Sequence, residues 1–249
     1  MENGSVFTLN NKKILVTGAS SGIGKVIAQE LSKQGAILVL SGRNKARLEK
    51  TLNLLSGHGH KISICDITSP EDLDKLSSES EVFDGIIFCA GIINYMPAKY
   101  LDTQTFDDII NVNFKSQILL YQQLHKKKKI KKGASLVFIS SVSALCGVAG
   151  TLAYSASKAA INSSVRVLAT ELSKLKIRVN SISPGLIDTP LLEVQELDQN
   201  SLNKELSKYP LGKGNAIDIA NASIFLLSDA SRWITGIDLI VDRGYLLKI

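Results

Sequence analysis

Short apolar runs alternate with helix-forming segments along the whole chain, and this alternation constrains the fold more than any other feature. The apolar runs are continuous, which indicates strands that are buried on both faces of a sheet. Strands that alternate with helices predict parallel pairing through helical crossovers. The sequence therefore predicts an α/β fold with a doubly wound parallel sheet of about seven strands and helices on both faces. The predicted strands are residues 13–17, 36–40, 61–65, 85–89, 135–140, 177–183 and 237–241.

Helices are predicted at residues 26–34, 45–55, 68–77, 106–127, 151–175 and 217–227. In these segments apolar residues recur at helical spacing or a capping residue begins the segment. Residues 191–209 are polar with scattered apolar side chains, so we expect a flap there. No linker or internal repeat interrupts the pattern. We therefore expect residues 1–249 to form a single domain.

The formal net charge of +6 is local. Six lysines account for all of it, namely Lys126, Lys127, Lys128, Lys129, Lys131 and Lys132. We expect them to form the solvated C-terminal end of a helix, where cations complement the helix dipole. A nucleic-acid surface is the sharper alternative, but no aromatic residues alternate with the lysines, so we predict no nucleic-acid partner. A contact of these lysines with an acyl-carrier protein stays open, whereas a contact with a membrane surface is an alternative that we do not favour.

Several classes of protein are disfavoured by what the sequence lacks. No apolar run approaches the ~20 residues that span a bilayer, and residues 1–13 lack the apolar core of a secretory signal. Cys65, Cys89 and Cys146 form no CxxC pair, and the three histidines fit no metal motif. We therefore predict no metal, no disulfide, no membrane contact and a reducing, cytoplasmic location.

A glycine-rich turn follows the first predicted strand and opens a helix. It reads Thr17-Gly18-Ala19-Ser20-Ser21-Gly22-Ile23-Gly24. Glycines let the backbone amides approach a pyrophosphate closely, and the helix N-terminus adds its positive dipole end. The GxxxGxG spacing differs from GxGxxG, and the turn lacks the Lys-Ser/Thr end of a P-loop. The strand–turn–helix context predicts a dinucleotide site.

Tyr154 and Lys158 are four residues apart in a helix-forming stretch, so they lie on one helix face. An ammonium beside a phenol favours the phenolate and lowers the pKa of the tyrosine. That would adapt the tyrosine to proton transfer at neutral pH. Alone, the pair is more often part of an ordinary helix, because YxxxK is a short and common pattern.

Together these motifs resemble the short-chain dehydrogenase/reductase family over nearly the whole chain, and in particular its 3-oxoacyl-carrier-protein reductases. TGASSGIG resembles the cofactor turn and YSASK the YxxxK motif. The resemblance implies a Rossmann fold and the catalytic set Asn113, Ser141, Tyr154 and Lys158. It also implies a cofactor site of Gly18, Ser20, Ser21, Gly22, Ile23, Gly24, Arg43, Asp66, Ile67, Ala90, Gly91, Tyr154, Lys158, Pro184, Gly185, Ile187 and Thr189.

By this resemblance, a hydride passes between the nicotinamide and a small-molecule carbonyl or alcohol, and Tyr154 moves the proton. Ser141 would hydrogen-bond the substrate oxygen, Lys158 would lower the pKa of Tyr154 and hold the ribose, and Asn113 would anchor a water. Residues 191–209 would be a substrate lid. The two long helices would form a homodimer or homotetramer. A non-catalytic dinucleotide-binding redox sensor or regulator is the alternative.

The end of the second predicted strand bears on coenzyme choice. Gly42 occupies the position where an acid would bind the ribose hydroxyls and repel a 2′-phosphate. Arg43 follows and can pair with a phosphate in a bidentate manner. Although Ser21 supplies no second cation, we predict NADP(H) as the preferred coenzyme, with NAD(H) possible.

One departure from the family pattern follows the fourth predicted strand. The family has Asn-Asn before Ala-Gly, whereas this chain has Phe88-Cys89 before Ala90-Gly91. A thiol cannot make the hydrogen bonds of an amide, so we expect an effect on stability more than on function.

Overall fold

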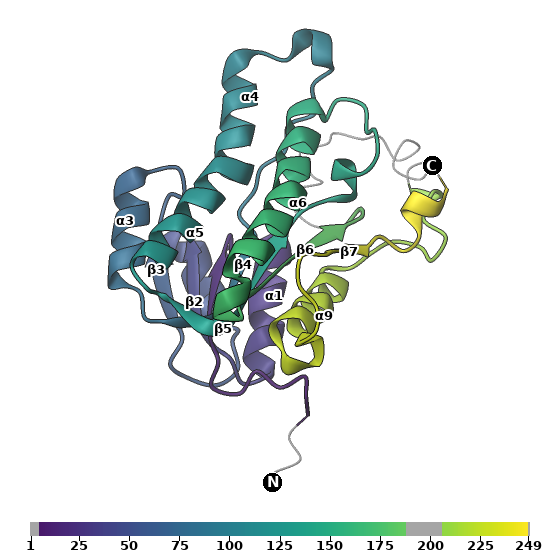
Figure 1. The fold of residues 1–249 in the computed structure, drawn as a ribbon. Coiled ribbons are helices and arrows are strands. Elements are labelled where there is room, and N and C mark those ends of the chain that lie inside the picture. The colour runs from purple at the N-terminus through teal and green to yellow at the C-terminus, as the bar shows by residue number, and fades with distance from the viewer. Residues whose placement is uncertain (1–4, 188–205, 249) are drawn as a thin grey trace.

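The computed structural model describes residues 5–187 and 206–248, and its centre is one seven-stranded parallel sheet in the order β3-β2-β1-β4-β5-β6-β7 (Figure 1). The predicted doubly wound α/β fold is confirmed. The strands are β1 (Lys13–Thr17), β2 (Ile37–Gly42), β3 (Lys61–Ile64), β4 (Phe83–Phe88), β5 (Ile130–Ile139), β6 (Arg178–Pro184) and β7 (Asp238–Val241).

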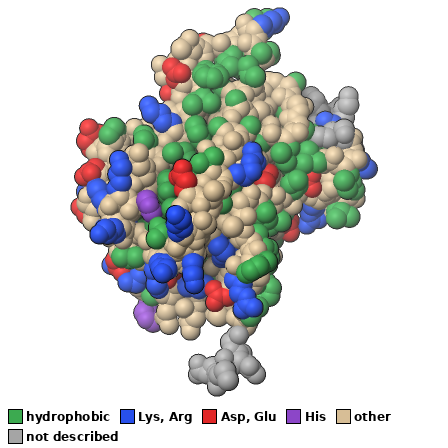
Figure 2. Space-filling view, in the orientation of Figure 1, with side chains coloured by type: hydrophobic (Ala, Val, Ile, Leu, Met, Phe, Trp, Pro, Cys, Tyr) green, Lys and Arg blue, Asp and Glu red, His purple; other side chains and the backbone are tan. Residues whose placement is uncertain are grey.

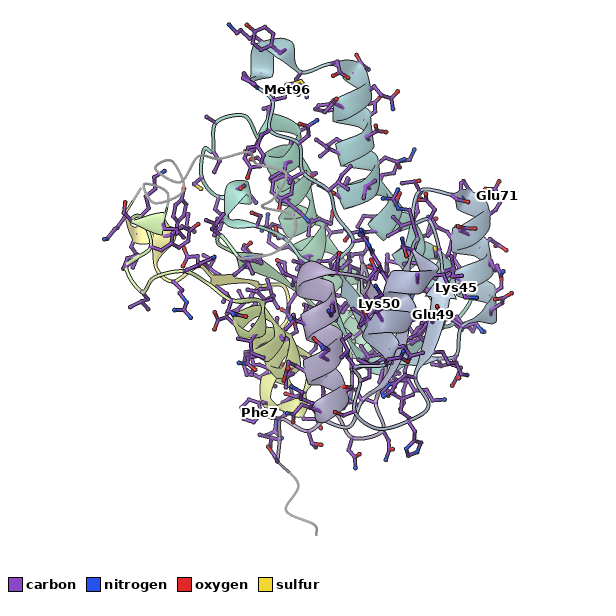
Figure 3. All side chains as sticks on the ribbon, turned by 180° about the vertical axis from the view of Figure 1, so that it is seen from behind. Phe7, Lys45, Glu49, Lys50, Glu71 and Met96 are labelled. Carbon is purple, nitrogen blue, oxygen red and sulfur yellow. The ribbon has the colours of Figure 1, made fainter. Side chains whose placement is uncertain are left out.

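Helices cover both faces of the sheet. Seen from behind, α1 (Gly22–Lys33), α2 (Lys45–Leu52) and α9 (Ala216–Leu227) lie on one face (Figure 3). The other face carries α3 (Pro70–Glu79), α4 (Thr103–Ile110), α5 (Ser116–Lys126) and α6 (Leu152–Leu172) (Figure 1). A separate apolar core fills each interface. In the central strand β1, the consecutive residues Ile14, Leu15 and Val16 are therefore all buried, since both faces of the sheet are covered.

The strand order reverses beside β1, which pairs with β2 on one side and with β4 on the other. The helix between β1 and β2 lies on one face of the sheet, and the helices between β4 and β5 lie on the other face. A crevice therefore opens between them, above the carboxyl ends of the strands. Ligands of open α/β sheets bind at such a switch point. The fold thus brings the glycine-rich turn after β1 and the Ala90-Gly91 segment after β4 to one edge.

Three predictions about secondary structure need correction. The helix after the glycine turn begins at Gly22, inside the turn. The predicted helix 106–127 is two helices separated by a π-helical turn, η2 (Asn111–Lys115). The edge strands are not buried on both faces, because Ile64 of β3 and Ile240 of β7 are exposed. An edge strand has only one neighbouring strand and less cover from helices, so its apolar residues do not indicate burial.

The lysine run is also not simply the end of a helix. α5 ends at Lys126, Lys128 has a left-handed φ of 56°, and β5 begins at Ile130, so the last two lysines lie in a strand. Lys127 pairs with Asp74 at 2.6 Å and Lys131 with Asp84 at 2.6 Å. Part of the local charge is therefore compensated within the fold.

Within the described residues, no helix is both long enough and apolar enough to cross a membrane. The same part of the chain holds no cluster of three His, Cys, Asp or Glu side chains suited to a metal ion. All three cysteines are described, and none forms a disulfide.

Candidate active site

A cavity of about 1040 Å³ lies above the carboxyl ends of the central strands. Sixteen residues of the predicted cofactor site line it: Gly18, Ser20, Ser21, Gly22, Ile23, Gly24, Arg43, Asp66, Ile67, Ala90, Gly91, Tyr154, Lys158, Pro184, Gly185 and Ile187. Ser141 lines it as well, whereas Asn113 lies behind the wall. Thr189 and the predicted lid up to residue 205 lie outside the described residues.

The glycine-rich turn presents an open helix end to this cavity. The N-cap residue of α1, Ser21, makes no side-chain cap hydrogen bond, although side chains cap α2, α3, α4 and α9. A Cβ on Gly18 would lie 2.9 Å from Ala90 Cα, and one on Gly24 would lie 2.4 Å from the Gly18 oxygen. The turn is therefore tight enough to require glycine, and its uncapped helix N-terminus fits a pyrophosphate.

Thr17 joins the ends of β1 and β4 below this turn. Its hydroxyl donates to Ile87 O at 3.3 Å and accepts from Cys89 N at 3.0 Å and Ala90 N at 3.3 Å. The backbone on both sides of Cys89 is thus held by Thr17 without an asparagine amide. Burial raises the pKa of the Cys89 thiol to about 11, so the thiol is protonated at neutral pH and is not a nucleophile.

Asn113 lies in the π-helical turn η2 and is fully buried. Its Oδ1 accepts from Ile92 N at 2.7 Å, and its Nδ2 donates to Ile92 O at 2.8 Å and to Ser157 Oγ at 3.1 Å. Both amide hydrogens and one lone pair of the Asn113 carboxamide thus fix the loop after β4 to α6.

Ser141 and Tyr154 lie close together on the wall of the cavity. Ser141 follows β5, is 8% exposed, and accepts a hydrogen bond from Ser143 N at 3.1 Å. Burial raises the pKa of Tyr154 to about 12 and outweighs the opposing effect of a hydrogen bond with Ser141. The phenol is therefore protonated at neutral pH and can donate its proton.

Lys158 lies one helical turn beyond Tyr154 and is 4% exposed. Its ammonium donates to Ile139 O at 2.9 Å and lies 5.6 Å from the centre of the Tyr154 ring. Burial lowers the pKa of Lys158 to about 8. The expected lowering of the Tyr154 pKa by Lys158 is thus not present in this structure, because burial of the phenol dominates and the ammonium bonds a backbone carbonyl.

Replacing Lys158 by Met is expected to change how the free energy of unfolding depends on pH. Burial lowers the pKa of Lys158 from 10.5 to about 8, so between these pH values the unfolded chain binds one more proton than the folded chain. The stability contribution of Lys158 therefore rises with pH, by at most about 1.4 kcal/mol per unit. Methionine has a similar length and no charge, so it lacks this contribution.

Urea unfolding of both proteins at pH ~7 and pH ~9.5 measures this difference. The stability of the wild type relative to Lys158→Met should increase by about 1–3 kcal/mol between the two values. Cys65, Cys89 and Tyr154 have raised pKa values, so they lower the stability of both proteins as pH rises. Their contributions cancel when the free energy of unfolding of the variant is subtracted from that of the wild type. A difference that is the same at both pH values would contradict the buried cation.

Two arginines line the cavity at the end of β2. Arg43 was predicted there, and its guanidinium lies 3.9 Å from the Asp66 carboxylate. Arg47, on the first turn of α2, also lines the cavity and was missed, because it follows the predicted position by four residues. Burial raises the pKa of Asp66, but hydrogen bonds from Thr68 and the charge of Arg43 together hold it below its usual value.

The wall beside Ser141 was not predicted from the sequence. Val142, Tyr209 and Tyr245 form a buried apolar cluster, and Leu186 packs against it. These residues come from four segments that are distant in sequence, and no local pattern marked them. At the rim, Met96 N donates to Gly150 O at 2.8 Å, which joins the loops after β4 and β5 at the upper end of the molecule (Figure 3).

A family model described as enoyl-(acyl carrier protein) reductase matches residues 18–246. The chain belongs to the short-chain dehydrogenase/reductase family. It is therefore an oxidoreductase, and the predicted family resemblance is confirmed. A 3-oxoacyl-(acyl-carrier-protein) reductase of Rickettsia felis is 32% identical over 240 residues, which cover 96% of this chain and 98% of the relative.

Solved structures of other short-chain dehydrogenases/reductases superpose along nearly the whole chain. A putative short-chain alcohol dehydrogenase from Sinorhizobium meliloti has a TM-score of 0.92 at 29% identity and covers 98% of this chain and 100% of its own. A putative 2-deoxy-D-gluconate 3-dehydrogenase from Agrobacterium tumefaciens, with bound NADP, has a TM-score of 0.89 at 29% identity with the same coverage.

Proposed function

We propose that the protein transfers a hydride between NADP(H) and a ketone or secondary alcohol. The observation that carries this proposal is the convergence of Ser141, Tyr154 and Lys158 on the cavity that also contains the glycine-rich turn. The uncapped N-terminus of α1 and the tight Gly18 turn fit the pyrophosphate of a dinucleotide. When bound, NADPH supplies the hydride.

Each of these side chains has a role that follows from its surroundings. Tyr154 is protonated at neutral pH, so it donates its proton to the carbonyl oxygen during reduction. The Ser141 hydroxyl stabilises the charge that develops on that oxygen. Lys158 holds the ribose beside the tyrosine, and Asn113 fixes the Ile92 loop and, through it, the cavity wall.

NADP(H) is proposed over NAD(H) because two cations and no acid lie at the end of β2. Arg43 and Arg47 line the cavity there, and Gly42 offers no carboxylate to bind the ribose hydroxyls or repel a phosphate. The bound NADP of the Agrobacterium tumefaciens relative supports the same choice.

We propose 3-oxoacyl thioesters as the substrate class. The wall beside Ser141 is apolar and aromatic, which suits an acyl chain better than a sugar acid that needs many hydrogen bonds. Turnover of acetoacetyl thioester should exceed turnover of 5-ketogluconate by at least about tenfold in kcat/KM with NADPH. Equal or reversed rates would contradict the substrate class and leave the reaction type intact.

We also propose a homodimer or homotetramer formed through α4, α5 and α6. Phe106, Leu119, Leu152 and Val167 on these helices are exposed. Hydrophobic side chains gather over the upper part of this face (Figure 2). Covering them would stabilise an assembly. Light scattering at micromolar concentration should give at least twice the chain mass of 26.9 kDa, and a monomer alone would contradict the interface.

Two broader proposals complete the assignment. One sheet includes strands from Lys13 to Val241, which supports a single NAD(P)-binding domain for residues 1–249. The absence of disulfides among three cysteines supports a reducing compartment, the cytoplasm.

A further inference from the structure

The wall beside Ser141 contains a stacked pair of tyrosines. The rings of Tyr209 and Tyr245 lie 4.7 Å apart at an interplanar angle of 24°, and both side chains are almost fully buried. Tyr209 is the last residue of the predicted lid and is among its described residues, and Tyr245 follows the last strand. Both line the large cavity and pack on Val142, the residue after Ser141. The pair is therefore a fixed part of the wall at the substrate end.

The backbone around each tyrosine is built to hold this arrangement. The Tyr209 hydroxyl accepts a hydrogen bond from Leu186 N at 2.9 Å. The Asp242 carboxylate accepts from Gly244 N at 2.8 Å and from Leu246 N at 2.9 Å, which fixes the turn that carries Tyr245. A Cβ on Gly185 would lie 2.8 Å from Tyr209 Cε1, so the ring packs directly on the turn after β6.

Arg243 strengthens this turn from the other side. It has a left-handed φ of 51°, which a non-glycine residue adopts only where its surroundings hold it. Its guanidinium donates to Leu211 O at 2.8 Å and pairs with Asp218 at 3.1 Å. These contacts join the segment just after Tyr209 to the segment just before Tyr245, so they hold the two rings in their stacked arrangement.

A second cavity of about 150 Å³ shares one wall with the large cavity. Gly185, Leu186, Ile187 and Tyr209 line both cavities. The other side of the small cavity is formed by the end of β7, including Val241. Two of the four shared residues, Ile187 and Tyr209, are almost fully buried, and only Tyr209 carries an aromatic ring. Its ring therefore separates the two spaces.

We propose that Tyr209 is a specificity-determining residue that limits the length of the acyl chain by closing off the small cavity. This inference rests on the proposed reduction of 3-oxoacyl thioesters. Removing the ring would join about 150 Å³ to the substrate end, which is roughly five times the volume of a water molecule in the liquid. Leu186, Ile187 and Val241 would then offer an apolar lining to methylene groups. The charged residues of the small cavity already have partners, since Arg243 pairs with Asp218 and the Asp242 carboxylate accepts from Gly244 N and Leu246 N.

The test compares Tyr209→Ala with Tyr209→Phe. The phenylalanine variant keeps the ring and removes only the acceptor for Leu186 N, so it is the matched control. The readout is the ratio of kcat/KM for 3-oxodecanoyl to acetoacetyl thioester, with NADPH. Tyr209→Ala should raise this ratio at least about tenfold, since burying two more methylenes is worth about one decade. Tyr209→Phe should keep the ratio within about twofold of wild type.

Suppose that the wild type turns over acetoacetyl thioester and that Tyr209→Ala leaves the ratio unchanged. This result would contradict the proposal that Tyr209 closes off the small cavity, but it would leave the proposed function standing. A merely structural role would lower both rates together and would not move the ratio. If the alanine variant fails to fold, Tyr209→Leu removes the ring, keeps apolar volume and carries the same expectation.

A readout without turnover separates this inference from the proposed function. The affinities of saturated decanoyl and butyryl thioesters are measured by calorimetry in the presence of NADP⁺. Tyr209→Ala should raise the ratio of decanoyl to butyryl affinity by at least about tenfold over wild type. Equal ratios in both proteins would contradict the proposal that Tyr209 closes off the small cavity, even if no thioester proved to be a substrate.

Discussion

Tyr154→Phe is expected to lower kcat by about 10²-fold or more while the affinity for NADP(H) stays close to wild type. Phenylalanine keeps the ring and the helix but removes the proton that the carbonyl oxygen must receive. The pKa of Tyr154 lies at about 12, so the wild-type phenol holds this proton at neutral pH. Steady-state rates with a 3-oxoacyl thioester, together with calorimetric titration of NADP⁺, measure the two effects separately.

Tyr100→Phe is the matched control, because the same hydroxyl is removed from an exposed tyrosine that does not line the cavity. It should leave kcat within about twofold of wild type. The raised pKa also predicts a direction of pH dependence. Oxidation of the alcohol needs the phenolate, so its rate should rise as pH increases toward the pKa of Tyr154. Wild-type turnover by Tyr154→Phe would contradict the assignment of the proton donor.

The double variant Gly42→Asp, Arg43→Ala is expected to reverse the coenzyme preference. The wild type should favour NADPH over NADH by about ten- to hundredfold in kcat/KM, since one charge-assisted contact to the 2′-phosphate contributes ~1.5–3 kcal/mol. The new aspartate would repel that phosphate and bind the ribose hydroxyls of NADH. A Cβ at Gly42 meets nothing closer than Leu48 Cδ2 at 3.6 Å, so the aspartate fits without strain.

Lys45→Ala is the control for a general loss of positive charge. Lys45 lies on α2, the helix that also carries Arg47, but it does not line the cavity. Its ammonium pairs with Glu49 at 3.8 Å (Figure 3). It should leave the preference unchanged within about twofold. Arg47→Ala, in contrast, should reduce the preference for NADPH, because Arg47 lines the cavity beside Arg43. A wild type that prefers NADH, or a double variant that still prefers NADPH, would refute the prediction that the end of β2 sets the coenzyme preference.

Features with a local origin were predictable from the sequence. β1 (Lys13–Thr17) has the predicted bounds, because a continuous apolar run before a glycine-rich turn leaves few alternatives. Tyr154 and Lys158 share one helix as their spacing required. The family resemblance then placed Ser141 and the Pro184-Gly185 turn at the same cavity, although they come from different strands.

Features that depend on packing between distant segments were not predictable. The π-helical turn around Asn113 arises where that carboxamide bonds the Ile92 backbone, and the helical pattern of the sequence continues through it. The raised pKa of Tyr154 reflects burial, which a spacing rule cannot supply. The stacking of Tyr209 on Tyr245 depends on how the chain folds back after β7. The prediction that all six lysines end one helix was wrong, because α5 ends and β5 begins within the run.

The most direct test of the central claim follows a label from coenzyme to product. NADPH that carries deuterium at the transferable C4 position is incubated with acetoacetyl thioester and the wild-type protein, and the product is analysed by mass spectrometry. The account predicts a 3-hydroxybutyryl thioester with one deuterium on its hydroxyl-bearing carbon, and about 10²-fold slower labelling by Tyr154→Phe. Binding of NADPH without any labelled product across the 3-oxoacyl series would contradict the account and favour a non-catalytic, redox-sensing role.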